Sequence, residues 1–359
     1  MLKNRVAKNQ KLLRKWARKN SVTCFRLYDR DIPEIPLAID LYEFLPDDVA
    51  TPEEAQDYIN SQAAAESANI PGAAERRLRQ TFLKVFLYER PYEKPEEEER
   101  EWLGSMTKAL SESLKIDLAH ITTKTRLRDK GGSQYAKGAD SPGDGKNSSQ
   151  AQKAAAPLAG RVYENGAIFW VDLTTYLDTG LFLDMRAARA LIKANAKGKR
   201  VLNLFCYTSS FSMAAALGGA ASVQSVDLSN TYLDWSRKNA ALNGLDKAAM
   251  EWTKADVMQF LDSCKDKFDI IILDPPTFSA SKSAKESLDT KRDWTVLCKK
   301  CLALLGADGV LYFSTNAKTL KFDSGLLPGA RAQEITERTI DPDFKTKKSH
   351  RMWLLQNAE

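Results

Sequence analysis

The residues best suited to chemistry form a short loop, Asp274-Pro275-Pro276-Thr277-Phe278, which follows the apolar run at 270–273. In an open α/β sheet, ligands bind beyond the carboxyl ends of the strands, where an acid at this position would lie. The two prolines fix φ and lack N–H donors, so the loop can keep its shape without backbone hydrogen bonds. We therefore predict a rigid loop that presents a carboxylate and an aromatic ring to a crevice, although the same residues could simply end a strand.

Two more acids end the strands predicted upstream of this loop. Residues 201–205 read as a buried parallel strand, followed by the turn Cys206-Tyr207-Thr208-Ser209-Ser210 and an apolar helix. The next strand ends in Asp227, about twenty residues after that turn begins, where a carboxylate can accept from both hydroxyls of a ribose. A third strand ends in Asp256, placed to accept from an adenine amino group. Each acid alone is as consistent with a helix cap, but in register they predict a nucleoside-binding α/β domain.

The first turn also indicates which nucleoside compound binds. It lacks Gly-x-Gly-x-x-Gly, which argues against a dinucleotide whose pyrophosphate must be cradled. S-adenosylmethionine has no phosphate and does not require that cradle. Downstream, a helix at 288–305, a strand at 310–314 and closing segments at 331–336 and 351–355 are predicted. A parallel sheet with an antiparallel end is typical of class I methyltransferases, so by analogy we expect a Rossmann-like α/β sheet of this class.

With these motifs in place, the chain resembles a known family. It is similar to the guanine-N7 methyltransferase half of the bifunctional bacterial 23S rRNA methyltransferase K/L, and more distantly to the 23S rRNA cytosine-C5 methyltransferase of the same superfamily. The matching stretches run in collinear order along nearly the whole chain, and they are Lys11–Arg18, Cys24–Asp29, Tyr176–Asp184, Leu202–Phe205, Asp274–Ser279 and Ala332–Thr336.

The resemblance implies S-adenosylmethionine as the cofactor and assigns roles to residues. Asp227 would hold the ribose, Asp256 the adenine, and residues 203–208 the methionine end. Residues 181–186 would close the pocket, and the Pro-Pro loop would face the target base. The expected cofactor-binding residues are Phe182, Asp184, Arg186, Asn203, Phe205, Tyr207, Thr208, Asp227, Leu228, Asp256, Val257 and Asp274, and the expected catalytic residues are Asp274, Pro275, Pro276 and Thr277.

The chain departs from the family pattern at several places. The family usually has Tyr-Thr-Gly in the first turn, whereas Ser209 stands at the glycine position, and a positive φ there would strain a serine. Met185 occupies a position where histidine or glutamine is common, and residues 129–160 look like an insertion. The bifunctional proteins carry another methyltransferase and an RNA-binding module before the matching region, so we expect a stand-alone relative or a fragment.

The identity of the methylated atom follows from the residues near the Pro-Pro loop. Cytosine C5 normally requires a cysteine nucleophile, and Cys206 lies in the cofactor turn, a poor position for that attack. An exocyclic amine typically meets an asparagine, from which Asp274 departs. Guanine N7 carries an in-plane lone pair, so the enzyme needs only to position the base. It is therefore the target atom that fits the residues near the loop best. Cytosine C5 methylation and a non-catalytic RNA-binding relative stay open as alternatives, while a protein or small-molecule substrate is disfavoured by the basic segments.

Length and composition predict two domains. We expect an N-terminal basic α+β region at 1–165, with a flexible loop at 131–160, and a methyltransferase domain at 166–359; the strand at 167–173 could join either. The sequence has no apolar run of about 18 residues, so we predict no membrane span. The five cysteines show no paired framework, and Cys298-Lys299-Lys300-Cys301 lies in a helical apolar pattern. We therefore predict core cysteines, no metal site and a reducing cytoplasm.

The positive charge of the chain is concentrated at its start. The net charge is +6, and residues 1–30 hold ten cationic side chains against one acid, Asp29. Helical spacing would place Leu12, Leu13 and Trp16 opposite the basic face. Such an imbalance indicates a surface that contacts phosphates, here of 23S rRNA or a large-subunit precursor. Oligomeric state is not predicted. The expected RNA-binding residues from this helix and two later basic segments are Lys11, Arg14, Lys15, Arg18, Lys124, Arg126, Arg128, Lys347, Lys348 and Arg351.

Overall fold

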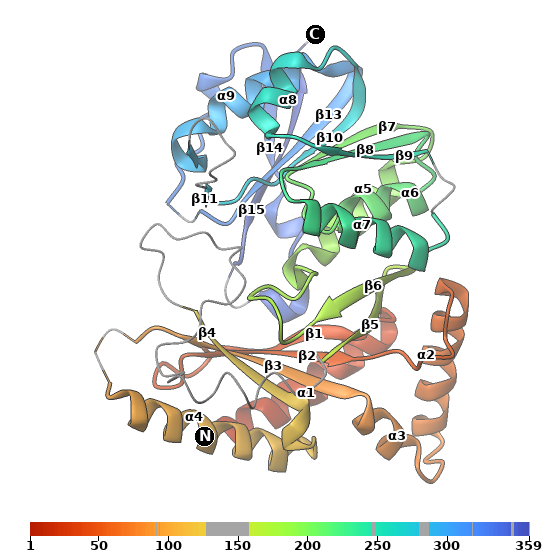
Figure 1. The fold of residues 1–359 in the computed structure, drawn as a ribbon, viewed down its shortest axis with the longest axis vertical. Helices are drawn as coiled ribbons and strands as arrows, with labels where there is room; N and C mark the ends of the chain where they lie inside the picture. The colour runs from red at the N-terminus through yellow and green to blue at the C-terminus, as the bar shows by residue number, and fades with distance from the viewer. Residues whose placement is uncertain are drawn as a thin grey trace. The chain divides into compact units, whose positions relative to one another are not determined.

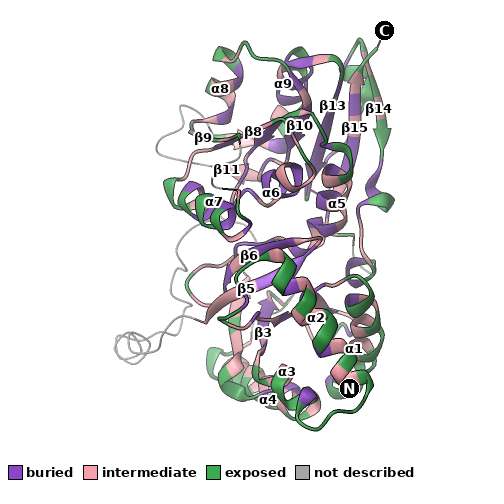
Figure 2. Cartoon of the chain, turned by 90° about the vertical axis from the view of Figure 1, so that its right-hand side faces the viewer, coloured by how far each residue is buried: buried purple, intermediate pink, exposed green. Residues whose placement is uncertain are grey.

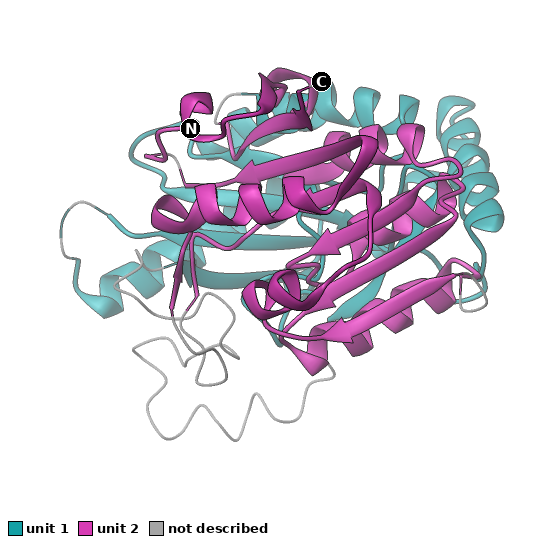
Figure 3. Cartoon of the chain, turned by 90° about the horizontal axis from the view of Figure 1, so that it is seen from above, with its two compact units in different colours: residues 1–130, 134–183, 342–347 teal, residues 131–133, 184–341, 348–359 magenta. Residues whose placement is uncertain are grey.

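The computed structural model describes residues 1–90, 92, 94–126, 158–245, 249–279, 287–317, 319–345 and 348–358. The chain forms two compact units, coloured separately in Figure 3: unit 1 comprises residues 1–130, 134–183 and 342–347, and unit 2 comprises 131–133, 184–341 and 348–359. Most of the predicted flexible loop at 131–160, together with Arg128 and Lys347, lies outside the described residues. Its last three positions are described, and the final two begin strand β5 (Ala159–Glu164).

The division between the units differs from the boundary expected after residue 165. That boundary would cut a β-hairpin, because β5 pairs antiparallel with β6 (Ala167–Asp172) through the two-residue turn Asn165-Gly166. Both turn residues have positive φ, +52° and +79°, as a type I′ hairpin turn requires. The hairpin stays whole in unit 1, and the chain enters unit 2 between Leu183 and Asp184.

Unit 1 is built on a four-stranded sheet in the order β1-β2-β3-β4 (Figure 1). The strands β1 (Cys24–Asp29), β2 (Leu37–Glu43) and β3 (Thr81–Tyr88) are antiparallel, and β4 (Ile121–Arg126) is parallel to β3. Apolar side chains of this sheet pack against α1 (Leu2–Lys19) and α4 (Glu96–Leu114), which include the buried Val6 and Leu110. Two further helices are α2 (Pro52–Ser67), whose start has a capping box made by Thr51 and Glu54, and α3 (Ala73–Arg79).

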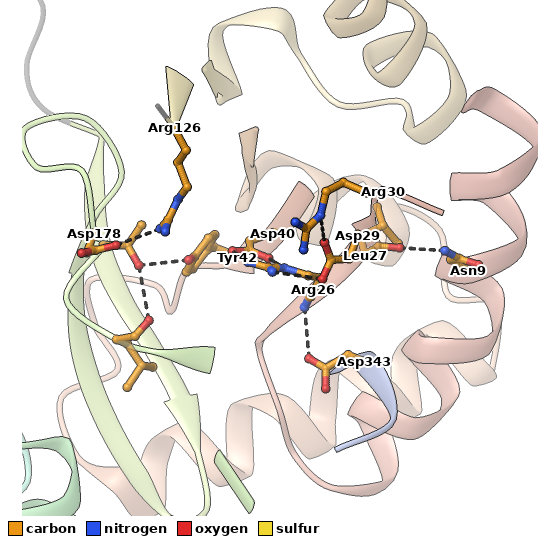
Figure 4. A network of polar contacts seen from close by, with 12 residues as sticks. Asn9, Arg26, Leu27, Asp29, Arg30, Asp40, Tyr42, Arg126, Asp178 and Asp343 are labelled. Carbon is orange, nitrogen blue, oxygen red and sulfur yellow. Dashed lines mark hydrogen bonds and ion pairs between the residues drawn. The ribbon is translucent and has the colours of Figure 1, made fainter. Parts of the chain in front are cut away.

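A polar network fixes β1 and β2 of unit 1 (Figure 4). The guanidinium of Arg26 donates to both carboxylate oxygens of Asp40, at 2.7 and 3.0 Å. The backbone N–H of Arg26 donates to Asp343 at 3.1 Å, so the short helical turn Pro342–Phe344 is anchored to β1 although it lies far away in sequence. Asp29 accepts from Arg30 at 2.7 Å. Each of these buried acids in β1 and β2 is therefore matched by an arginine.

Unit 2 is built on a seven-stranded sheet in the order β14-β15-β13-β10-β7-β8-β9. The strands β9 (Met250–Lys254), β8 (Ser222–Asp227), β7 (Arg200–Leu204), β10 (Phe268–Leu273) and β13 (Leu305–Thr315) run parallel. β15 (Arg351–Asn357) is antiparallel to both β13 and β14 (Ala330–Glu334). This confirms the predicted Rossmann-like sheet with its antiparallel end. β8 and β10 flank β7 on opposite sides, which makes the β7/β10 boundary the point where strand order reverses.

Helices cover both faces of the unit 2 sheet. In Figures 1 and 2, α5 (Arg186–Asn195), α6 (Ser210–Leu217) and α7 (Asn230–Leu242) lie on one face, and α8 (Val257–Ser263) and α9 (Thr290–Ala303) lie on the other. The central strands β10 and β13 are buried between these layers (Figure 2). Cys298 and Cys301 are fully buried free thiols in α9, which confirms their prediction as core residues. Within the described residues, no helix has the length and apolar composition needed to cross a bilayer.

Candidate active site

The turn after β7 has an unusual backbone. Phe205, Tyr207 and Ser209 have φ values of +55°, +52° and +60°, so three alternate residues that are not glycine adopt the left-handed conformation. Such conformations cost free energy and persist where the surroundings impose them. The structure thus places Ser209 at a positive φ, the condition under which strain was expected. The turn also brings the backbone of residues 205–209 to the carboxyl edge of the sheet, where a ligand can approach it.

Side chains from α7 hold this turn in place. The hydroxyl of Ser209, which is fully buried, donates to the hydroxyl of Ser236 at 2.8 Å. Ser236 lies 3.2 Å from the carbonyl of Tyr207, and Asn239 donates to the carbonyl of Thr208 at 3.0 Å. These neutral hydrogen bonds stabilise a backbone that the sequence alone disfavours. A glycine could not make the Ser209–Ser236 hydrogen bond. The hydrogen bond of the serine therefore offsets part of the free-energy cost of its positive φ.

Asp227, at the end of β8, meets the geometric requirement for a ribose ligand. Its two carboxylate oxygens accept from the backbone N–H groups of Tyr207 and Ser229, both at 2.9 Å. Burial raises the pKa of Asp227, and backbone hydrogen bonds oppose that rise. An ionised carboxylate has about four acceptor positions, so it can also accept from two ribose hydroxyls. The residues present therefore fit the nucleoside part of S-adenosylmethionine.

Asp256 is the N-cap of α8. Its Oδ1 accepts from the backbone N–H of Gln259 at 3.1 Å, and Val257 beside it is buried. The cap uses one acceptor position, which leaves the carboxylate able to accept from an adenine amino group as well. Leu228, which follows Asp227, is half-buried. The two readings of this acid, cap and ligand, are therefore compatible.

Two of the expected cofactor residues have interior side chains. The side-chain amide of Asn203 is buried and donates to the hydroxyl of Ser212 at 2.8 Å, and Ser212 is 2.7 Å from the hydroxyl of Ser225. Thr208 is also fully buried. These placements join β7, α6 and β8 beneath the turn and favour a supporting role for both side chains. The backbone of this turn therefore stays the predicted contact for the methionine end of the cofactor.

The Pro-Pro loop is held at both ends by hydrogen bonds, whereas its prolines alone had been expected to keep its shape. The hydroxyl of Ser314, at the end of β13, donates to Asp274 at 2.6 Å. Thr290, at the start of α9, donates from its hydroxyl to the carbonyl of Pro276 at 2.6 Å and from its N–H to the carbonyl of Thr277 at 3.1 Å. The hydroxyl of Thr277 is hydrogen-bonded to Asn316. Asp274 is thus held at the carboxyl ends of β10 and β13.

Several ionisable groups surround Asp274. Burial is the largest cause of its raised pKa; Asp184 adds to the rise, whereas the Ser314 hydrogen bond, His350 and Arg189 oppose it. Arg186, 2% exposed, donates to Asp341 at 3.0 Å. Asp184 and Arg186 both belong to unit 2, and Asp184 lies near enough to Asp274 to raise its pKa. Phe182, from the same predicted segment, belongs to unit 1.

His350 lies in sequence between the basic residues Lys348 and Arg351, but its side chain is in the interior. His350 is 2% exposed; its Nε2 lies 3.0 Å from the hydroxyl of Thr339 and its Nδ1 lies 3.9 Å from Asp184. It therefore belongs to the interior group that faces Asp274. Because Lys345 and Lys348 lie nearby in sequence, a surface position would be expected for this histidine. No local sequence pattern indicates that it is buried.

The first basic segment is only partly available to a ligand. Lys11 and Lys15 on α1 are exposed. Arg14 and Arg18 form ion pairs with Glu43 and Glu66, respectively. Burial lowers the pKa of Arg14 to about 10. The expected apolar face of this helix was wrong at one position, because Leu12 is 62% exposed; the helix buries Leu2, Val6 and Ala17 and packs Leu13 and Trp16.

Three described cations of the other two basic segments, Arg126, Lys348 and Arg351, also have acidic partners. Arg126 donates to Asp178 at 2.8 Å and lies over the ring of Phe86, while Lys124 beside it is half-buried. Arg351 pairs with Glu334 at 3.0 Å, and Lys348 pairs with Glu337. These contacts commit the arginines to internal pairing. The exposed lysines of α1 are therefore the better candidates for contacts with phosphates.

Known proteins are similar to this chain in sequence. A family model of S-adenosylmethionine-dependent methyltransferases matches residues 147–340. The ribosomal RNA large subunit methyltransferase K of Neisseria meningitidis serogroup B is 37% identical over 99% of this chain and 86% of its own length. The ribosomal RNA large subunit methyltransferase K/L of Pseudomonas fluorescens is 40% identical over 98% of this chain. The chain spans 40% of the length of that K/L relative.

Solved structures show the same fold at lower sequence identity. A Streptococcus mutans protein described as a SAM-dependent methyltransferase aligns over 99% of this chain and 80% of its own, with a TM-score of 0.66 and 20% identity. A methyltransferase structure with the same score was determined in complex with SAH. The chain therefore belongs to the family of S-adenosylmethionine-dependent methyltransferases that includes the ribosomal RNA large subunit methyltransferases K and K/L.

Proposed function

We propose that this chain methylates N7 of a guanine in 23S rRNA, with S-adenosylmethionine as the methyl donor. The observation that carries the proposal is the placement of Asp274. Its carboxyl is held by Ser314 at the carboxyl edge of the sheet, at the end of the strand next to β7, which leads into the cofactor turn. The names of the relatives supply the substrate class, a large-subunit ribosomal RNA.

The residues that would hold the cofactor are those at the ends of β7, β8 and β9. Asp227 would bind the ribose hydroxyls, Asp256 the adenine amino group, and the backbone at 205–209 the methionine end. When bound, S-adenosylmethionine supplies a methyl group on a positively charged sulfur. The protein then contributes mainly positioning and electrostatics, because a displacement of this kind needs the reacting atoms in line.

Asp274 would stabilise and orient the target base, and it would not act as a general base. Guanine N7 offers a lone pair and loses no proton on methylation, while the purine ring gains positive charge. An ionised Asp274 would stabilise that charge, and it could also accept from the guanine N1 or N2 donors. The loop would keep its position when the base binds, because Pro275 and Pro276 restrict its backbone and Thr290 holds it by hydrogen bonds. Phe278 is half-buried and is the aromatic residue of this loop on which a base could stack.

Cytosine C5 methylation is less well supported, because it needs a thiolate nucleophile. Cys206, the cysteine of the cofactor turn, is buried, and burial raises its pKa well above the ordinary value. A thiol in that state is a weak nucleophile at neutral pH. Cys298 and Cys301 are buried in α9, and burial raises their pKa as well.

The test is nucleoside mass spectrometry of 23S rRNA incubated with the protein and isotopically labelled S-adenosylmethionine. We expect label in N7-methylguanosine. Label in 5-methylcytidine would overturn the choice of atom and favour the sister reaction. If neither naked RNA nor ribosomal precursors gain label, a calorimetric titration with S-adenosylmethionine decides whether the chain is a non-catalytic RNA-binding relative.

A further inference from the structure

Asn316 is an exposed residue that directly follows β13, at the carboxyl edge of the unit 2 sheet. β13 pairs parallel with β10, and the last residues of this register are Phe313 and Leu273. The next residue of each strand also meets its counterpart, because the hydroxyl of Ser314 donates to Asp274 at 2.6 Å. Asn316 comes two residues after Ser314 and therefore lies at the same edge as Asp274.

A hydrogen bond to the Pro-Pro loop sets the orientation of the Asn316 amide. The hydroxyl of Thr277 donates to Oδ1 of Asn316. Because Oδ1 faces Thr277, the Nδ2 group points away from it with two N–H donors. Among the residues that the structure describes, Thr277 is the hydrogen-bond partner of this side chain, and its Nδ2 has none. Since Asn316 is exposed, a ligand can reach these donors.

Asn316 and Asp274 together present a donor and an acceptor at one edge of the sheet. Asp274 is half-buried, and its carboxylate keeps acceptor positions beyond the one that Ser314 uses. Guanine carries the complementary groups on one edge, because its acceptor O6 is followed by the donors N1–H and N2–H₂. Adenine has a donor amino group at the position of O6, so it does not match this pair.

We propose that Asn316 determines the choice of guanine as the target base by donating from Nδ2 to O6. Asp274 would accept from N1 or N2 on the same edge of the base. O6 lies beside N7 on the purine ring, so a base held at O6 also has a fixed direction for N7. The inference rests on the proposed methylation of guanine N7, and it adds the residue that reads the base.

The alternative is that Asn316 only anchors the Pro-Pro loop. Thr290 already holds this loop, with hydrogen bonds of 2.6 Å to the carbonyl of Pro276 and 3.1 Å to the carbonyl of Thr277. An anchor would affect methylation of any base by a similar factor. A donor to O6 would instead change the preference between bases that differ at this position. The ratio of the rates for two bases therefore separates the two roles.

The experiment compares guanine with 2,6-diaminopurine at the target position of 23S rRNA. The guanosine that the full chain methylates is first located by reduction and aniline cleavage, and RNA with either base there is prepared by splinted ligation. 2,6-Diaminopurine keeps N7 and the 2-amino group, but it has an amino group in place of O6 and no proton at N1. Single-turnover incorporation of labelled methyl groups gives the rate for each base.

We expect wild-type protein to methylate guanine faster than 2,6-diaminopurine, because the analogue places a donor against the Asn316 amide. Asn316→Asp keeps an acceptor for the Thr277 hydroxyl, but it replaces the amide donor by an oxygen that suits the 6-amino group. The ratio of the guanine rate to the diaminopurine rate should therefore fall by about 5- to 150-fold, the range for one mismatched hydrogen-bonding group. The added negative charge lies near Asp274 with either base, so the ratio is the readout.

The matched control is Thr290→Val, which removes a hydroxyl that anchors the same loop and leaves the Asn316 donor in place. It should lower both rates by a similar factor and keep the wild-type ratio.

Equal rates of wild-type protein with the two bases would overturn the inference without any variant. A wild-type ratio in Asn316→Asp would show that Asn316 only anchors the loop. In both cases N7-methylguanosine still forms, so the proposed function stands. If wild-type protein forms no N7-methylguanosine, the proposed function fails and this inference fails with it.

Discussion

Unit 1 and unit 2 both contain acidic side chains that are buried or half-buried, but the partners of these acids differ between the units. In unit 1, Asp40 faces Arg26, and Glu43 and Glu66 face three arginines. In unit 2, Asp227 and Asp274 are held by backbone N–H groups and a serine hydroxyl, and burial raises the pKa of both. A buried acid matched by a cation supports the fold. A buried acid whose hydrogen-bond partners are neutral keeps charge and acceptor positions for a ligand, which is the usual condition of a functional site.

The largest effect is expected for a substitution in unit 1 that removes the cation from a buried acid. Arg26→Met would leave Asp40 buried without its cation, which should lower the free energy of unfolding by about 3–5 kcal/mol. Urea denaturation followed by circular dichroism measures the change. The matched control is Arg5→Met, whose exposed side chain lies 3.9 Å from Asp31 and should contribute about 1 kcal/mol or less. Equal effects for the two variants would contradict the assignment of Arg26 to the core network.

The Asp274→Asn variant tests whether the acid of unit 2 acts through its negative charge. The amide oxygen can still accept from Ser314, so the fold should hold, but the negative charge is lost. We expect the rate of methyl transfer to guanine N7 to fall about 100-fold or more. Single-turnover incorporation of labelled methyl groups measures it, with the exposed Asp308→Asn as the control. Full activity in Asp274→Asn would remove this carboxylate from the mechanism.

Lys84 is a buried cation of unit 1 that differs from the paired arginines. Its ammonium group donates to the backbone carbonyl of Leu173. Burial lowers its pKa to about 7, and Lys124 adds to the effect. Between pH of about 7 and about 10, the unfolded chain therefore binds more protons than the folded one, so the free energy of unfolding should rise with pH. Urea midpoints across this window measure the slope. Lys84→Met should flatten it, whereas the exposed Lys108→Met should not; identical slopes would be inconsistent with a lowered pKa.

The smallest expected effect concerns the cofactor turn. In Ser209→Gly, relief at the positive φ is offset by loss of the hydrogen bond to Ser236, so the free energy of unfolding should change by less than about 1 kcal/mol. Ser236→Ala leaves a buried hydroxyl without its partner and should cost about 1–3 kcal/mol. Thermal denaturation of both single variants and the double variant forms a cycle. A large gain in Ser209→Gly would mean that the turn is strained without compensation.

The sequence predicted the parts of unit 2 that depend on local pattern. The acids at 227, 256 and 274 each follow a parallel strand, and the carboxyl ends of parallel strands meet at one edge, so their placement at the same edge of the sheet could be inferred. The Pro-Pro loop was predictable for the same reason. The hairpin at Asn165-Gly166 also carried a local signal, the Asn-Gly turn, which was missed when the boundary was placed after residue 165.

What the sequence could not show depends on partners distant along the chain. Arg14 and Arg18 have the spacing of a phosphate-contacting face, but their partners Glu43 and Glu66 come from β2 and α2. His350 sits among lysines, yet tertiary packing places it in the interior. Leu12 matches the apolar periodicity of α1, but the packed face is centred on Val6 and Leu13. In each case the sequence fixes which chemical group is available, and the fold decides what that group contacts.

The hydrogen bonds of Asp227 have a consequence for binding kinetics and affinity. Two backbone N–H groups hold its carboxylate in one rotamer before any ligand arrives. Immobilising a side chain on binding usually costs about 0.5–1.5 kcal/mol of conformational entropy. Because Asp227 is already ordered, a nucleoside bound as proposed would meet a preorganised acceptor, and its association would require no side-chain rearrangement at this position.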